Sequence, residues 1–193
     1  MENMLEREQA DQVQTELLRR VAARDRQAMS GFYQSTAGPM FSLALRILGD
    51  PGEAEEAVQD AFVQIWDKAG SFDPRLGSPF HWALGITRHR SIDRLRSRQR
   101  RTRLMEEFQN STASEPLAAS PADQGVVDAD QVAAIRSALN QLPREQREAI
   151  EMAFFGGKTH FEIAEAFQQP LGTIKARIRR GMLKLRDSLQ TYA

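Results

Sequence analysis

The sequence predicts an all-α protein of two small helical domains joined by a flexible linker, with a helix-turn-helix in the second domain. Apolar residues recur at helical spacing in most segments, and strand-like alternation is nearly absent. A stretch rich in Ser, Ala and Pro, from Asn110 to Gly125, interrupts the helical pattern. The 193 residues, 41% of them hydrophobic, are enough to give each of two domains a packed core.

Changes in composition mark the domain boundaries. They indicate an N-terminal tail over 1–15, a first helical domain over 16–104, a flexible linker over 105–130 and a second helical domain over 131–193. The linker is acidic, because six acids and no base stand between Glu106 and Asp130. It lacks both helical and strand periodicity, as segments that cannot bury apolar surface do.

The first domain is expected to consist of helices with one loop. Apolar spacing predicts its early helices around Leu17–Ala22, Met29–Tyr33 and Phe41–Leu48. In the next helix Asp50 can cap, Pro51 occupies the first helical position, and Glu53 supplies the reciprocal carboxylate of a capping box. Gly70 ends that helix, and a loop follows from Ser71 to Ser78. A further helix runs from about Pro79 through an arginine-rich block.

The second domain ends in two short helices with a brief break between them. Val132, Ile135 and Leu139 mark a first helix, and a second runs from Pro143 to the glycines at 156 and 157. Thr159 and Glu162 form a capping box for the third. The segment QQPLG breaks this helix, and Thr173 restarts it with a basic outer face. This pattern is typical of a helix-turn-helix.

The formal net charge is zero, but the charges stand in blocks. Eight arginines and a single acid, Asp93, lie between Arg88 and Arg103, and the stretch from Lys175 to Arg186 carries six bases and no acid. A basic helix of this kind repels itself unless something negative lies against it, which favours a nucleic-acid partner. The outer face expected to enter a major groove consists of Lys175, Ala176, Arg179 and Arg180. Arg177 points elsewhere and is expected to contact phosphate.

The alternative for the helix-turn-helix is an ordinary helical hairpin with a solvated basic face. It leaves three features unexplained: the small Ala164, the Pro170-Leu171-Gly172 turn, and bases without acidic partners. In the arginine block, aromatic residues just ahead of Arg88 can stack unpaired bases. Trp82 is either such a platform or a core residue, and Arg98 to Arg103 is either a binding surface or a solvated face. Val63 is either a tolerated surface valine or part of a protein docking face.

An enzymatic role has little support. There is no cysteine, which excludes disulfides and thiolate metal sites, and His81, His89 and His160 are not clustered. Nucleophile-elbow, phosphate-loop and paired-carboxylate motifs are absent, so we expect no catalysis, no cofactor and no metal. No apolar run is long enough to span a bilayer, and the acidic N-terminus is unlike a signal peptide. These features predict a cytoplasmic protein without direct membrane insertion.

From about Glu16 to Leu189, the chain resembles the extracytoplasmic-function sigma factors of the bacterial sigma-70 family. The segment ALRILGDPGEAEEAVQDAFVQIWDKAGSFDP is similar to their second region, and LPREQREAIEMAFFGGKTHFEIAEAFQQPLGTIKARIRRGMLKLR to their fourth. The resemblance implies binding to core RNA polymerase, at the β′ clamp helices and the β subunit. It also implies recognition of the −35 and −10 elements of promoter DNA, help in melting, and control by an anti-sigma factor. The alternative is an autonomous helix-turn-helix regulator that binds duplex DNA without polymerase.

The resemblance also assigns residues to three surfaces. The polymerase-binding residues are Gln59, Asp60, Val63 and Trp66. The −10 residues are the base-capturing loop Asp73, Pro74, Arg75 and Leu76, and the helix beneath it with Trp82, Arg88, His89, Arg90 and Asp93. The −35 residues are Thr173, Lys175, Ala176, Arg177, Arg179 and Arg180. His89 stands where the family commonly has Asn, and Gln168 where the turn usually carries Gly.

Overall fold

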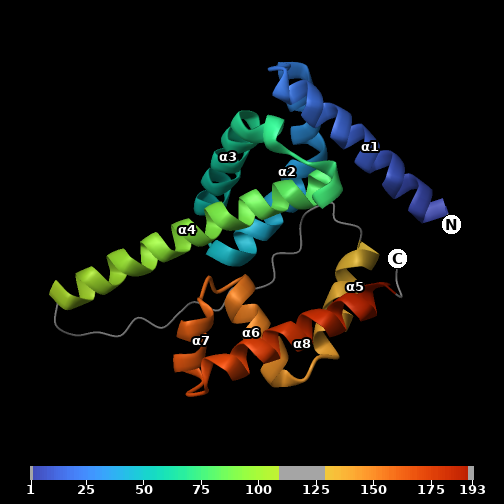
Figure 1. The fold of residues 1–193 in the computed structure, drawn as a ribbon. Helices are drawn as coiled ribbons and strands as arrows, with labels where there is room; N and C mark the ends of the chain where they lie inside the picture. The colour runs from blue at the N-terminus through green and yellow to red at the C-terminus, as the bar shows by residue number, and fades with distance from the viewer. Residues whose placement is uncertain (1, 109–128, 191–193) are drawn as a thin grey trace. The chain divides into compact units, whose positions relative to one another are not determined.

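The described part of the chain is built of helices and contains no strand, which confirms the predicted fold class. The computed structural model describes residues 2–108 and 129–190 (Figure 1). The helices fall into two compact units, Met1–Gly125 and Val126–Ala193.

The first unit holds four of the described helices and two short 3-10 turns. Its elements, in chain order, are α1 (Glu2–Ala22), α2 (Arg26–Leu48), α3 (Pro51–Lys68), η1 (Ala69–Ser71), η2 (Pro74–Leu76) and α4 (Pro79–Phe108). The segment 1–15, expected as a tail, is helical from Glu2 onward. The start of the predicted linker, 105–108, belongs to α4, and residues 109–128 of that prediction lie outside the described residues.

The core of the first unit forms where α2, α3 and α4 meet. Ala54, Ala57 and Ala61 of α3 are fully buried, so this helix approaches its neighbours closely. Phe32 and Met40 of α2 are also fully buried, and each such side chain contributes about 1.5–3 kcal/mol to stability. The apolar residues of α3 therefore form its buried side, and its other side faces solvent.

The start of α3 agrees with only half of the predicted capping box. Asp50 caps the helix by accepting a hydrogen bond of 2.8 Å from the Glu53 amide, with Pro51 at the first helical position. The reciprocal half is wrong, because the Glu53 carboxylate accepts a hydrogen bond of 3.2 Å from Arg98 of α4. This pairing joins residues 45 positions apart, which local sequence signals cannot show.

The second unit consists of α5 (Ala129–Asn140), α6 (Arg144–Phe154), α7 (His160–Ala166) and α8 (Leu171–Gln190). Its buried core contains Ala149, Ile163, Ala164 and Ile174. The capping box at Thr159 and Glu162 is confirmed in both directions.

The turn between α7 and α8 departs from the prediction at one point. α8 begins at Leu171, two residues before the expected restart at Thr173. The reason is that the Thr173 amide already donates a hydrogen bond of 2.9 Å to the Pro170 carbonyl, which closes the first turn of the helix. Gln168 adopts φ 51°, the left-handed conformation that glycine prefers, so the turn keeps this shape without a glycine.

The packing of α8 on α6 depends on Gly181. A Cβ atom at this position would lie 2.6 Å from Cδ1 of Ile150 and 3.3 Å from Cβ of Gln146. The absence of a side chain therefore lets the two helices approach, and it fixes which side of α8 faces the unit's interior.

Candidate nucleic-acid and protein interfaces

One face of α8 presents bases to solvent. Lys175, Ala176, Arg179 and Arg180 are all exposed. Their spacing places them on one side of the helix, while Ile174 and Gly181 are buried against the unit. Among the described residues no carboxylate pairs with these three bases; the Arg180 Nε donates to the carbonyl of Ala176 at 3.3 Å. Thr173 is half-buried in the first turn of the same helix.

Arg177, in contrast, is mostly buried and is paired with a carboxylate. Its side chain is 15% exposed, and its Nη2 lies 2.8 Å from Oε2 of Glu145 in the first turn of α6. Arg186 pairs with the adjacent Asp187 at 2.9 Å. The expectation that the bases of this segment lack acidic partners is therefore wrong at these two positions. Arg177 therefore joins α8 to α6. The whole of α7 lies between these two helices in the sequence.

The predicted base-capturing loop, residues 71–78, folds as two single 3-10 turns joined by extended residues. Asp73 caps η2 by accepting the Arg75 amide at 3.0 Å, and its carboxylate also pairs with the Arg75 guanidinium at 2.7 Å. The hydrogen bonds from Arg75 lower the pKa of the Asp73 carboxyl. Leu76, 87% exposed, is an apolar side chain that packing does not require at this place.

The first turns of α4 support this loop. The rings of Phe72 and Trp82 lie 5.5 Å apart between centroids, and the Ser78 hydroxyl lies 2.7 Å from Nδ1 of His81. Trp82 is half-buried, so its ring both packs on Phe72 and keeps some surface accessible. The two predictions for Trp82, platform and core, are thus both compatible with its position.

Arg88 and His89 follow on the same helix. His89 is exposed and Arg88 is half-buried. Burial, and secondly the positive charge of Arg96, lower the pKa of Arg88.

Other arginines of the block face α3. Arg94 pairs with Glu56 and with Asp60, each at 2.6 Å, and the hydrogen bond that Arg94 donates to the Asp60 carboxylate is the main cause that raises the pKa of Arg94. Arg98 pairs with Glu53 and donates to the Leu48 carbonyl at 3.0 Å. These arginines hold α4 against α3. The sequence carried the signal, because acids spaced along α3 match bases spaced along α4.

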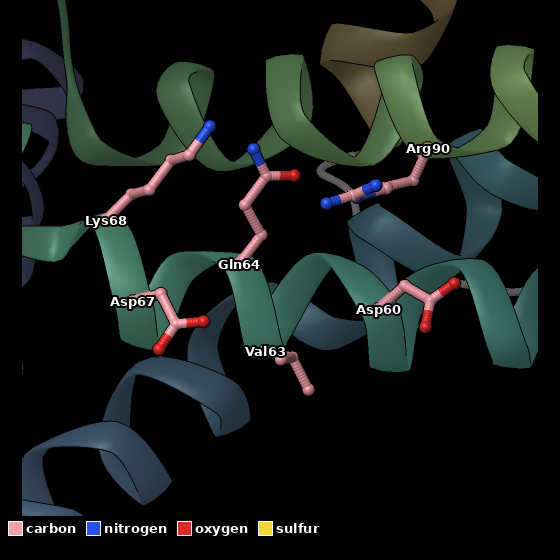
Figure 2. Close-up of a pocket in the computed structure, with 6 residues that line it drawn as sticks. All are labelled: Asp60, Val63, Gln64, Asp67, Lys68 and Arg90. Carbon is pink, nitrogen blue, oxygen red and sulfur yellow. The ribbon is translucent and has the colours of Figure 1, made fainter.

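On the side of α3 that faces away from the core, the central residues are exposed to solvent. Gln59 is exposed and Val63 is 63% exposed, whereas Asp60 is paired with Arg94. Trp66 is half-buried, and the guanidinium of Arg24 lies 5.4 Å from its ring centroid. In Figure 2, Val63 points away from α4, whereas Gln64 and Lys68 point toward it.

Two features are absent from the described residues. Over that part of the chain, no group of three or more His, Cys, Asp or Glu side chains could hold a metal ion. Over the same part, no helix is long and apolar enough to cross a membrane.

The fold and these surfaces define a two-domain helical protein of the helix-turn-helix class. Comparison with known families narrows this class. Residues 32–101 match Sigma-70 region 2, and residues 133–185 match Sigma-70, region 4. The ECF RNA polymerase sigma factor SigK of Mycolicibacterium vanbaalenii is 36% identical over 173 residues, which cover 90% of this chain and 87% of the relative. The chain belongs to the ECF RNA polymerase sigma factors, as its resemblance predicted.

A further relative and two solved structures are also similar to this chain. SigK of Mycobacterium tuberculosis strain H37Ra is 32% identical over 173 residues, covering 90% of this chain and 91% of the relative. The crystal structure of Rhodobacter sphaeroides SigE in complex with the anti-sigma ChrR shows 31% identity, with a TM-score of 0.44, and covers 92% of this chain and 98% of that chain. Bartonella quintana RpoE in complex with the anti-sigma factor NepR shows 26% identity, with a TM-score of 0.34, and covers 79% and 90%.

Proposed function

We propose that this chain binds core RNA polymerase and directs it to promoters by recognising a −35 element and a −10 element and assisting melting. The observation that carries the DNA-binding part is the exposed face of α8, where Lys175, Arg179 and Arg180 have no described acidic partner. A basic helix of a helix-turn-helix unit is suited to a major groove, where arginine and lysine read guanine.

In the −35 surface, Lys175, Ala176, Arg179 and Arg180 read base edges, and Thr173 lies at the first turn where the helix enters the groove. Arg177 has a different role from the phosphate contact first expected. Because Arg177 is 15% exposed and paired with Glu145, it positions α8 instead of touching DNA.

In the −10 surface, the loop Asp73, Pro74, Arg75 and Leu76 receives a base that has left the stack. Unstacking costs a few kcal/mol, so the pocket must return that energy through stacking and hydrogen bonds. The exposed Leu76 offers apolar contact, Arg88 offers positive charge, and Trp82 and His89 offer rings. Arg75 is paired with Asp73, and its exposed guanidinium offers hydrogen-bond donors. The cap from Asp73 holds the loop in shape before a base arrives.

The outward face of α3, with Gln59, Asp60, Val63 and Trp66, docks core polymerase at its β′ clamp helices, and the second unit contacts the β subunit. The protein acts in the cytoplasm, where polymerase and chromosome meet. It has no catalytic activity of its own and needs no cofactor. An anti-sigma factor holds it inactive until a signal, in keeping with the family to which the chain belongs.

A loop exchange tests the −10 assignment. Residues 73–76 are replaced by those of a relative with a different −10 preference, and start sites are mapped with core polymerase. We expect the preference to move with the loop, with His89 tuning it. Retention of the original preference would show that the loop does not capture the base.

A pull-down with core polymerase separates this function from the alternative of an autonomous regulator. The sigma factor binds core polymerase without DNA, whereas a regulator binds duplex DNA without polymerase.

A further inference from the structure

A ladder of ion pairs joins α3 to α4, and the arginine at its last position, Arg90, has no acid opposite it among the described residues. Arg90, Arg94 and Arg98 stand four residues apart, so they form one stripe along α4. Arg98 pairs with Glu53, and Arg94 pairs with Glu56 and Asp60, so the two helices run antiparallel. The next position of the ladder on α3 is Gln64, one turn after Asp60. A neutral amide stands where the pattern calls for an acid.

Arg90 is consequently without an anion. Its Nε is buried and has no hydrogen-bond partner, and no described carboxylate pairs with its guanidinium. Figure 2 shows Arg90 pointing from α4 toward α3, and Gln64 pointing from α3 toward α4. Both line a shallow groove with Asp60, Val63, Asp67 and Lys68. A half-buried cation without a counter-charge is unfavourable, so an anion entering the groove gains more than at an open surface.

The uncompensated charge of this groove is positive. Its two acids already have cationic partners: Asp60 lies 2.6 Å from Arg94, which also pairs with Glu56, and Asp67 lies 3.7 Å from Arg24. Counted together with Lys68 and Arg90, four bases stand against these three acids. Its two bases, Lys68 and Arg90, have no acidic partner among the described residues. The groove therefore fits an anion, although it contains equal numbers of acids and bases.

The neighbouring charges favour a protein carboxylate over a DNA phosphate. The exposed side of α3 carries Glu55, Glu56, Asp60 and Asp67, and a strand with a phosphate at every nucleotide would meet these acids. A protein partner can place a single Asp or Glu side chain at Arg90 while the surface around that side chain packs on Val63, which is 63% exposed. The expected partner surface therefore carries one acid for Arg90, apolar groups for Val63 and basic groups for the acids of α3.

We propose that Arg90, with Lys68, binds a carboxylate on the docking surface of core RNA polymerase. Arg90 then belongs to the polymerase-binding surface and not to the −10 surface. This inference rests on the proposed function, because it names the chemistry of the polymerase side at the same docking face.

The first test compares Arg90→Glu and Arg90→Gln with a matched control, Arg101→Glu. Arg101 is exposed on the same helix, lies outside the groove and undergoes the same charge reversal. We expect Arg90→Glu to weaken core binding by about tenfold or more, Arg90→Gln by several fold, and Arg101→Glu by less than about twofold. Fluorescence-detected binding of the full chain to core polymerase measures these affinities.

Stability and DNA preference separate docking from other roles. Because Arg90 makes no internal pair, Arg90→Gln should leave thermal unfolding unchanged, whereas a structural role would lower the melting temperature. The −10 preference, measured at saturating core polymerase, should also stay unchanged. Unaltered core affinity of Arg90→Glu together with altered −10 preference would place Arg90 on DNA and overturn the inference. Failure of the wild-type chain to bind core polymerase would instead refute the proposed function.

The second test completes the ladder inside the protein. Gln64→Glu gives Arg90 an acid at the vacant step, so the first unit should become more stable and core affinity should fall. Adding Arg90→Gln to this variant should remove the gain in stability. If Gln64→Glu raised the melting temperature but left core affinity unchanged, the partner would not use Arg90, and the inference would be wrong.

Discussion

Replacing Arg177 by alanine distinguishes a base that holds α8 in place from a base that contacts DNA. The change removes the ion pair with Glu145 at 2.8 Å and the packing of a side chain that is 15% exposed. Glu145 is 67% exposed, so water screens the pair, and its share is about 0.5–1 kcal/mol. The buried aliphatic stem adds about 1 kcal/mol. We therefore expect the second unit to lose about 1–2 kcal/mol of stability.

Amide hydrogen exchange can measure this loss in the full chain. Both tryptophans, Trp66 and Trp82, belong to the first unit, so their fluorescence does not report on the second. Exchange of the amides in α6 and α8 should accelerate about 5- to 30-fold in Arg177→Ala. Glu145→Gln should reproduce part of the effect, and the double variant should lose less than the sum of the two.

Arg180→Ala is the matched control, because Arg180 is exposed on the same helix. It should leave exchange unchanged, lose about 1–3 kcal/mol of binding to a good −35 site, and relax preference at one base pair. Arg177→Ala should keep both affinity and the salt dependence of binding at a temperature where the unit stays folded. If it left exchange unchanged and lowered the salt slope by about one, Arg177 would contact phosphate, and the positioning role would be refuted.

Three further predictions concern turns and packing. Gln168→Gly should stabilise the second unit by about 1 kcal/mol, because Gln168 holds φ 51°; slower exchange in α7 and α8 would report it, and an unchanged rate would mean that the turn is not strained. The pKa of Asp73 is depressed by Arg75, so the cap of the loop should persist above the ordinary value of 3.8 and be lost as pH falls through the lower folded pKa. An NMR titration checks this, and an ordinary or raised pKa would contradict it. Gly181→Val should destabilise α8 against α6 by about 1–3 kcal/mol, since its Cβ would lie 2.6 Å from Ile150 Cδ1; a variant with wild-type exchange would disprove the close approach.

The elements could be predicted because their signals are local. The cap at Asp50, the capping box at Thr159 and Glu162, and the Pro170 break each act within a few residues of the chain. The buried side of α3 likewise follows the helical spacing of its own apolar residues. Helix ends were less predictable, since α1 begins at Glu2, well before the apolar spacing over Leu17–Ala22 that predicted this helix.

The partners of charged side chains could not be predicted in the same way. Sequence shows that bases cluster, but not which acid lies opposite each of them after folding. Arg177 therefore looked available for DNA until its contact with Glu145 was known, and Asp60 looked free until its contact with Arg94 was known. The groove at Arg90 was missed for the same reason, although the spacing of acids on α3 and arginines on α4 held the signal.

Start-site mapping with core polymerase tests most directly whether this chain is a promoter-specific initiation factor. A promoter library randomised at the −35 and −10 positions is transcribed with core polymerase, with and without the full chain. We predict that the chain creates new starts, that the active promoters share two sequence elements, and that Arg180→Ala relaxes the upstream element alone. Sequence-specific binding of the free chain to duplex DNA, with no starts added to core polymerase, would contradict the proposed function.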